Sequence, residues 1–208
     1  TTATVQFATK KYFELKQFLP SYPAVPNDLY NPEIQIYRGY WLISWFKKEF
    51  AAKECVEALK RGCSPEEILN ERLREVPPGC EGLILQPFWT PGVVTPNAKG
   101  AIIGFSDAHS RIHLYRAIIE GIGFALMDGM YSMEKRGHQK ISEIFVAGGG
   151  SQSDEICQIT ANMFGLEVKR IQTHEASGLG ASMVGFVAAG IYHNYEEAIE
   201  HMVRVATV

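Results

Sequence analysis

Hydrophobic and polar residues follow two periods along the chain, one typical of strands and one typical of helices. Short apolar or alternating segments predict strands, whereas apolar residues that recur every three or four positions predict helices. The segments that predict strands are residues 2–8, 12–15, 34–37, 82–88, 144–147 and 166–171, and residues 100–105 form a further short apolar segment. The segments that predict helices are residues 40–51, 64–75, 110–135, 154–164, 176–189 and 195–204.

The helix expected at residues 64–75 has clear boundary signals. Ser64 suits the N-cap, Pro65 suits the first helical position, and two glutamates follow in the first turn. A Pro-Pro-Gly sequence stands shortly after the helix and cannot continue it. Two proline-containing stretches, residues 19–32 and 89–99, are expected to be surface loops.

The order of these elements predicts the fold class. Three strands come first, and helices then alternate with strands. Such an order favours a mixed sheet with helices packed on both faces. We therefore expect an α/β fold, with residues 1–208 in one domain.

Composition excludes several classes of protein. A hydrophobic content of 46% can fill a sizeable core, and a formal net charge of −3 provides no basic surface for nucleic acid. The longest apolar stretch, residues 178–191, is too short to cross a membrane. The four cysteines show no C-x-x-C spacing and suggest free thiols in a reducing cytoplasm. Because the first residue is Thr1 and stands at a predicted strand, we expect that an upstream part is missing.

The segment with the strongest chemical signal is a glycine-rich turn. An apolar strand, residues 144–147, leads into Gly148, Gly149 and Gly150, and a helix is expected from Asp154. Glycines allow the backbone to approach a ligand closely, and the first turn of a helix offers N–H groups without intrahelical acceptors. A tight strand-to-helix turn without a ligand is the alternative. Three successive glycines favour a binding role.

A dinucleotide-binding turn is a competing interpretation of the same segment. It requires the pattern G-x-G-x-x-G and a carboxylate at the end of the next strand. Ser153 occupies the place of the last glycine, and the next strand ends in residues 170–172, with no acidic residue before Glu175. The dinucleotide interpretation is therefore disfavoured.

Further glycines interrupt two apolar helices. Glycine lowers helix propensity, so close backbone packing is the expected compensation. We expect such packing at Gly178 and Gly180 in one helix and at Gly121, Gly123 and Gly129 in the other.

A metal site would need more ligands than the chain shows. His109 and His113 share one helix face, and Asp107 lies near the start of that helix. No third ligand follows at a clear spacing, and an aspartate at a helix start is commonly a cap. No metal site is expected there. The chain also lacks a G-x-S-x-G turn and a useful Cys–His pair, so nucleophilic hydrolysis has no support.

Four segments, in order, resemble the FGGY carbohydrate kinases, the family that contains xylulokinase, glycerol kinase, gluconokinase and ribulokinase. Residues 87–89, Pro-Phe-Trp, are similar to a P-Y-W turn of the family. Residues 100–120 resemble its second signature, with Phe105 where an aliphatic residue is usual. Residues 146–165 are similar to its adenosine-binding strand–turn–helix, and residues 175–182 to its terminal E-x-x-x-L-G-A-A element.

The resemblance implies a ribonuclease-H-like domain of the actin and hexokinase type, here the second of two domains with ATP between them. It further implies that Gly148, Gly149 and Gly150 border the adenosine and that Ser153 lies within reach. Thr1 and Thr2 resemble the end of a turn that holds the ATP phosphates. Gly39 is similar to a family glycine near the nucleotide, although the following Tyr40 departs from the family pattern.

The activity implied by the resemblance is transfer of a phosphoryl group from ATP, with Mg²⁺, to a hydroxyl of a sugar or polyol. The catalytic aspartate is expected in the missing N-terminal part, so we assign no catalytic residue and no metal ligand here. The chain alone is expected to be inactive. Its expected partners are the sugar or polyol and its own N-terminal domain, with homodimer formation as an option, but neither nucleic acid nor membrane. A non-catalytic, actin-like domain used for nucleotide-gated association is the alternative.

Overall fold

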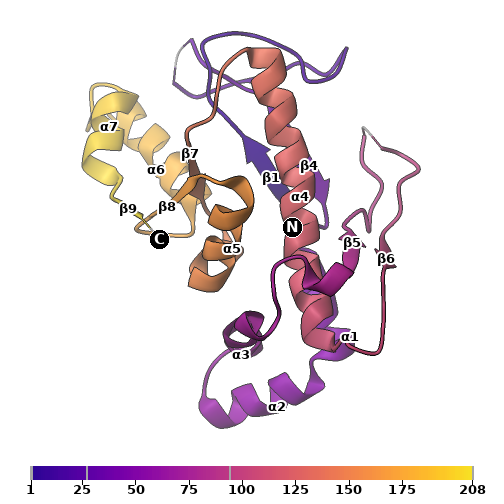
Figure 1. Ribbon diagram of the computed structural model, residues 1–208. Helices are drawn as coiled ribbons and strands as arrows, with labels where there is room; N and C mark the ends of the chain where they lie inside the picture. Colours follow the sequence, from indigo (N-terminus) through magenta and orange to yellow (C-terminus); the bar gives the residue numbers. More distant parts are fainter. Residues whose placement is uncertain (1, 27, 94, 208) are drawn as a thin grey trace. The chain divides into compact units, whose positions relative to one another are not determined.

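The computed structural model describes residues 2–26, 28–93 and 95–207, and Figure 1 shows its helices and strands. Thr1, one of the expected phosphate contacts, lies outside the described residues. The strands are β1 (Thr2–Gln6), β2 (Tyr22–Pro23), β3 (Tyr30–Asn31), β4 (Glu33–Tyr37), β5 (Ile84–Gln86), β6 (Ala101–Ile103), β7 (Glu143–Val146), β8 (Glu167–Ile171) and β9 (Val205–Thr207). The α-helices are α1 (Trp41–Phe50), α2 (Ala52–Arg61), α3 (Pro65–Glu71), α4 (Arg111–Gly137), α5 (Asp154–Phe164), α6 (Ala176–Ala188) and α7 (Tyr195–Met202).

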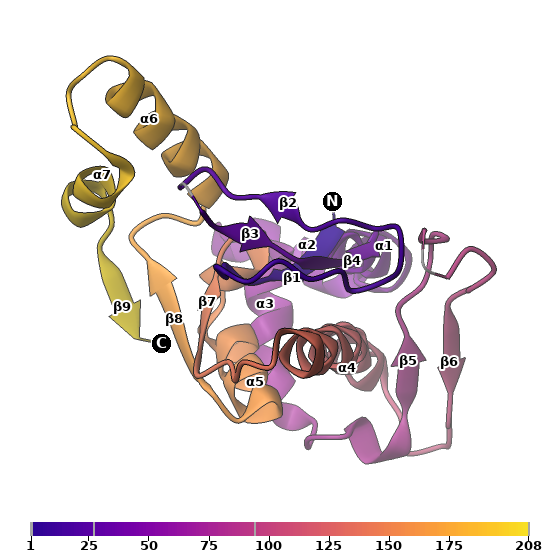
Figure 2. The same cartoon turned by 90° about the horizontal axis from the view of Figure 1, so that it is seen from above.

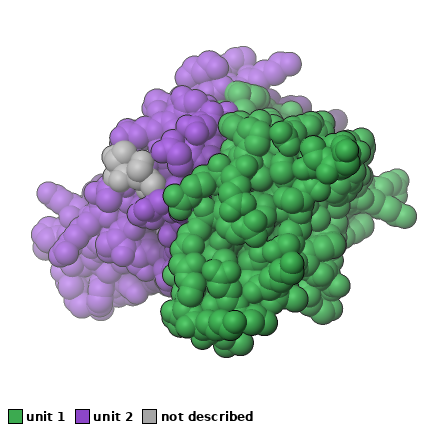
Figure 3. Space-filling model, turned by 60° about the horizontal axis from the view of Figure 1, so that its bottom comes forward, with its two compact units in different colours: residues 1–6, 33–132 green, residues 7–32, 133–208 purple. Residues whose placement is uncertain are grey.

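The chain divides into two compact units, coloured separately in Figure 3. Unit 1 comprises residues 1–6 and 33–132, and unit 2 comprises residues 7–32 and 133–208. Strands and helices occur in both units, as the sequence predicts for an α/β chain. Their strands form several small sheets in place of one continuous sheet.

Unit 1 pairs β1 with β4 and β5 with β6, both antiparallel. Its core lies along α4, where large apolar side chains are almost completely shielded from solvent. The buried side chains of this core include Leu42, Phe46, Leu69, Leu73, Ile112, Ile118 and Ile122. Burial of this apolar surface provides the main stabilisation of the unit.

Two glycines of α4 allow the close packing that the sequence predicts. A Cβ atom at Gly121 would overlap the backbone carbonyl of Leu85. A Cβ atom at Gly129 would lie 2.9 Å from Cβ of Ile34. Strands β5 and β4 therefore approach α4 more closely than any residue with a side chain would permit, which compensates for the poor helix propensity of glycine.

A buried ion pair joins α4 to the segment before β5. Nε of Arg116 donates to Oε1 of Glu120 at 2.7 Å, and Nη1 of Arg116 donates to the carbonyls of Leu73 and Val76 at 3.0 and 2.8 Å. The second carboxylate oxygen of Glu120 accepts from the backbone N–H of Gly79 at 3.0 Å. The pair thus also satisfies polar backbone groups that would otherwise be buried without partners.

Unit 2 contains the sheet β7-β8-β9, in which β7 and β8 are parallel and β8 and β9 are antiparallel (Figure 2). Helix α5 packs against β8 and buries Ile156, Cys157 and Ile159, together with Val168 of the strand. Helix α6 packs against α7. None of its residues is buried, although it is the most apolar of the three helices predicted after residue 150.

Local sequence signals explain where the structure agrees with the predicted elements, and tertiary contacts explain where it differs from them. The capping box at Ser64 forms as its sequence predicts, since Ser64 Oγ accepts from the Glu67 N–H and the Glu67 carboxylate accepts from the Ser64 N–H. Residues 12–15 form no strand, which contradicts the prediction. Strand β5 is only half buried, because Ile84 is exposed, so its apolar run does not mark a fully buried strand. Helix α2 and strand β9 have no counterpart in the prediction.

Candidate functional site

The candidate site is the turn between β7 and α5, for which the sequence predicts a strand, three glycines and a helix. Strand β7 ends at Val146, and Gly148 follows with φ +82° and ψ −175°, a conformation open almost only to glycine. A short 3₁₀ turn spans Gly149–Gln152, and α5 begins at Asp154 as predicted. The backbone therefore reverses direction within a few residues.

The space around two of these glycines is open. A Cβ atom built at Gly148 or Gly149 would meet no heavy atom within 4 Å. The protein's own packing within the described residues therefore does not require a missing side chain at Gly149. Among the same residues, the N–H groups of Gly149 and Gly150 donate to no acceptor outside the turn. Open space and unused donors together suit a ligand that approaches the backbone.

Ser153, also expected near the nucleotide, forms the N-cap of α5. Its Oγ accepts from the backbone N–H of Ile156 at 3.3 Å and donates to the Glu155 carboxylate at 2.9 Å. The hydroxyl hydrogen is thus already engaged. Ser153 can offer a ligand only its remaining acceptor capacity.

The turn is held from the side of β8, which sequence reasoning did not predict. The backbone N–H of Gly148 donates to the carbonyl of His174, just beyond β8, at 2.9 Å. From within β8, Nη1 of Arg170 donates to the carbonyl of Ser151 at 3.2 Å, and its Nη2 pairs with the Asp154 carboxylate at 2.7 Å. No local sequence pattern marks Arg170 for this role, because it depends on the pairing of β7 with β8.

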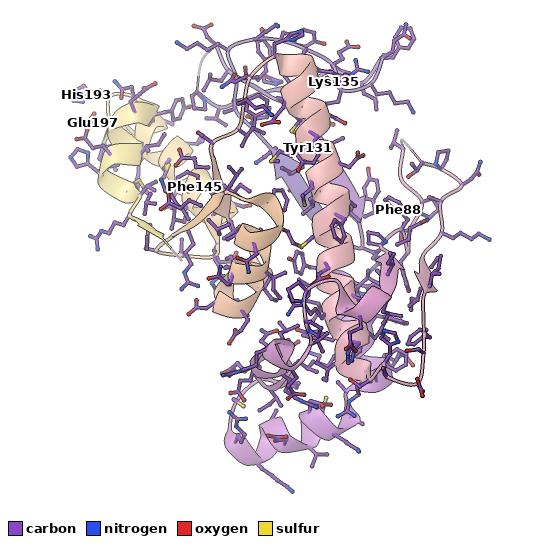
Figure 4. The ribbon with its side chains drawn as sticks, viewed as in Figure 1. Phe88, Tyr131, Lys135, Phe145, His193 and Glu197 are labelled. Atoms are coloured by element: carbon purple, nitrogen blue, oxygen red, sulfur yellow. The ribbon has the colours of Figure 1, made fainter. Side chains whose placement is uncertain are left out.

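Burial and neighbouring charges raise the pKa of two further side chains in this region, Cys157 and Lys169. Burial raises the pKa of the Cys157 thiol, which points its Sγ at the carbonyl of Ser151, 3.5 Å away. On β8, the hydrogen bond from Lys169 to Glu143 raises the pKa of the lysine. The Lys169 ammonium also lies 5.9 Å from the ring centre of Phe145, the exposed β7 side chain labelled in Figure 4.

The other expected nucleotide contacts lie in unit 1, whereas the glycine turn lies in unit 2. Thr2 begins β1 and pairs with Tyr37 of β4. A Cβ atom at Gly39 would lie 2.5 Å from Cβ of Ala3, so close packing at the end of the antiparallel β1–β4 pair requires this glycine. Packing alone therefore accounts for the missing side chain at Gly39.

The packing expected at the second glycine cluster is not found. A Cβ atom at Gly178 or Gly180 would meet nothing within 4 Å. The prediction that these glycines allow α6 to approach a sheet closely is wrong for unit 2, because among the described residues the space beside both glycines is open. A glycine pattern alone does not reveal whether the space beside it is filled.

The two histidines near the start of α4 already have protein partners. Nδ1 of His109 accepts from the Ser106 N–H at 2.8 Å, and Nδ1 of His113 accepts from the Ser110 N–H at 3.1 Å. The described residues contain no group of three or more His, Cys, Asp or Glu side chains that could hold a metal ion. All four cysteines are free. None of the helices in the described part of the chain combines the length and apolarity needed to cross a bilayer.

Comparison with known proteins confirms the resemblance drawn from the motifs. The model of the FGGY family of carbohydrate kinases, C-terminal domain, matches residues 1–189. The xylulose kinase of Lactococcus lactis is 32% identical over 184 residues, which cover 86% of this chain and 34% of that enzyme. The chain thus spans about a third of the length of this relative.

Two solved structures share the fold. The xylulose kinase from Rhodospirillum rubrum superposes with a TM-score of 0.80 at 23% identity, over 100% of this chain and 40% of that one. Plasmodium falciparum glycerol kinase with ADP superposes with a TM-score of 0.67 at 18% identity, over 86% of this chain and 34% of that one. At these identities the likeness establishes the fold alone. With the family match over residues 1–189, the motifs and the fold agree that the chain belongs to the FGGY family of carbohydrate kinases.

Proposed function

We propose that the intact protein transfers a phosphoryl group from ATP to a hydroxyl of a sugar or polyol, and that this chain supplies the nucleotide-binding half. The observation that carries the proposal is the turn between β7 and α5, inside the region that matches the family. Gly148 and Gly149 border open space there, and among the described residues the N–H groups of Gly149 and Gly150 donate to no acceptor outside the turn. The relatives are kinases of several sugars, which supports the reaction class and leaves the acceptor open.

In this proposal, Gly148, Gly149 and Gly150 border the adenosine, where a side chain would obstruct the ligand. Ser153 contributes an acceptor at the start of α5. A neighbour with the same fold is described with ADP, which supports a nucleotide role for the fold. We also assign the fold to the ribonuclease-H-like class, because the chain shares its fold with this neighbour and belongs to the same kinase family.

For the phosphates and Mg²⁺, the proposal assigns residues other than the glycine turn. Thr1 and Thr2 would offer hydroxyl and backbone donors to the phosphates. Magnesium prefers phosphate oxygens, waters and one or two carboxylates to a cage of protein ligands, and it would neutralise charge on the transferred group. Phosphoryl transfer depends mainly on positioning and charge neutralisation, so the chain's contribution is to orient the nucleotide.

The acceptor hydroxyl needs a carboxylate base within hydrogen-bond reach. We place this aspartate in an N-terminal domain, because the chain spans only about a third of its Lactococcus relative. The chain alone would then bind nucleotide weakly and phosphorylate nothing. We further infer a cytoplasmic location, where ATP is available and the four free cysteines would stay reduced.

The test is a coupled assay of ADP release by the complete protein across pentoses, ketoses, hexonates and polyols. Phosphorylation of one acceptor class, with product confirmed by mass spectrometry, supports the proposal. The 208-residue chain is assayed in parallel and should release no ADP with any acceptor. Turnover by this chain at a typical kinase rate would overturn the division of labour between domains. ATP binding by the complete protein without phosphorylation of any acceptor would favour the association role.

A further inference from the structure

We propose that Arg170 is a positioning residue for the glycine turn, and that it sets the backbone conformation that the turn presents to a nucleotide. The inference rests on the proposed nucleotide role of that turn. It adds a residue that lies in neither the glycine segment nor the other segments that resemble family motifs. Every contact that supports it lies within unit 2.

The register of the sheet brings Arg170 to the turn. Strands β7 and β8 run parallel, and Val146, the last residue of β7, pairs with Arg170. The arginine therefore stands beside the point where the chain leaves the sheet. Its side chain spans the turn and contacts both Ser151 and Asp154 at 3.2 and 2.7 Å. A planar guanidinium can make two such contacts in fixed directions, which an ammonium cannot.

The contacted groups explain why the geometry of the turn depends on this residue. Ser151 is buried, and its carbonyl accepts from Arg170 and also lies 3.5 Å from the Cys157 thiol. The planar peptide bond means that the direction of a carbonyl also fixes the direction of the next N–H. Arg170 thereby orients the backbone that follows the glycines. The hydrogen bond from Gly148 to the carbonyl of His174 secures the other end of the turn.

Three successive glycines make such restraint necessary. Glycine loses more conformational freedom on ordering than any other residue, and these positions have no side chains to hold them. A turn that is already ordered avoids this entropic cost when the ligand binds. The restraint from β8 should therefore appear mainly in nucleotide affinity.

The exposure of the Arg170–Asp154 ion pair allows a positioning role to be distinguished from a contribution to global stability. The Arg170 side chain is 33% exposed and the Asp154 side chain is 73% exposed. Ion pairs with such exposure contribute little to global stability. If Arg170 only stabilises the fold, its removal should change neither stability nor nucleotide affinity by much. If it positions the turn, its removal should weaken nucleotide binding and leave the stability nearly unchanged.

The test measures the Kd for ATP in the complete protein by calorimetry, together with thermal unfolding without nucleotide. Arg170→Met should raise the Kd about tenfold, which is about 1.4 kcal/mol, as expected for loss of a charge-assisted hydrogen bond. Arg170→Lys should restore little of the affinity, because it lacks the planar fork. Asp154→Asn keeps the contact to Ser151 and should raise the Kd only about threefold.

Lys169→Met is the matched control. Lys169 precedes Arg170 on β8 and pairs with the carboxylates of Glu143 and Glu167, and none of its polar contacts among the described residues is with the turn. Its removal should change the Kd by less than about twofold. An unchanged Kd in Arg170→Met, or an equal loss in Lys169→Met, would refute the positioning role.

Hydrogen exchange separates this inference from the proposed function. Arg170→Met should speed exchange of the amides at residues 148–153, while α7 keeps its wild-type rates. If the wild-type protein binds no ATP, the proposed function fails, yet the exchange measurement still decides whether Arg170 holds the turn. If ATP binds normally and exchange is unaltered by Arg170→Met, the proposed function stands and the positioning role is wrong.

Discussion

Substitution of Gly149 by alanine tests whether this glycine is needed for ligand binding or for folding. A Cβ atom at this position meets no heavy atom within 4 Å, and Gly149 lies in a 3₁₀ turn without a positive φ. Alanine should therefore fit without strain. Because alanine restricts the unfolded chain, Gly149→Ala should raise the free energy of unfolding by roughly 0.4–1 kcal/mol, or leave it unchanged.

The same methyl group should weaken nucleotide binding. If the adenosine lies against the turn, the added atom takes up space that the ligand needs. Overpacking of a close contact costs about 1–3 kcal/mol, which corresponds to a 5- to 150-fold rise in Kd. The assays are urea unfolding and titration with a fluorescent ATP analogue. The affinity for ATP should thus fall, while the free energy of unfolding rises or stays the same.

Two control variants in unit 2 sharpen the measurement. Gly148→Ala should destabilise by about 1–3 kcal/mol, because φ at Gly148 is +82°. Gly185→Ala lies in α6, where the added Cβ also meets open space, and should stabilise without altering ATP affinity. A loss of more than about 1 kcal/mol of stability in Gly149→Ala, or ATP binding equal to that of the wild type, would refute a ligand role for Gly149.

The remaining predictions concern unit 1. Arg116→Met leaves the charge of Glu120 buried and unpaired, so it should cost about 3–5 kcal/mol in urea unfolding, and a cost below about 1 kcal/mol would contradict the pairing. Gly121→Ala places a methyl group against the Leu85 carbonyl and should destabilise by about 1–3 kcal/mol despite the better helix propensity of alanine, which thermal unfolding would show. Burial raises the pKa of the Cys80 thiol from 9.0 to about 12. The native state therefore holds this proton more tightly than the unfolded state, and its stability should fall as pH rises from 9 towards 12. A pH series of unfolding curves checks this, with Cys80→Ala expected to remove the alkaline loss.

Much of the local structure could be predicted because its causes are local. The capping residues around Ser64 mark the start of α3, and the bounds of α5 follow from the helical period and from the Ser153 cap. The glycine turn and the order of the surrounding motifs also indicate the family from the sequence alone, and the family match confirms it. These signals depend on residues that are neighbours in sequence.

Other features could not be predicted, since they depend on contacts between distant segments. The apolar run at residues 82–88 resembles a buried strand, but the exposure of its side chains depends on which elements cover β5. Likewise, identical glycine signals correspond to tight packing at Gly121 and Gly129 and to open space at Gly178 and Gly180. A glycine in the sequence shows where a side chain is missing. It does not show which residue, if any, lies beside that position in the fold.

The sequence by itself therefore determined that a strand, a glycine turn and a helix stand in series, and that they belong to a kinase family. Only the tertiary structure decided what holds this turn. The parallel register that pairs Val146 with Arg170 places a guanidinium against the carbonyl of Ser151, 19 residues earlier in the chain. Strand register depends on which face of each strand is buried, so the residues beside Arg170 in the sequence do not by themselves show that it lies next to Val146.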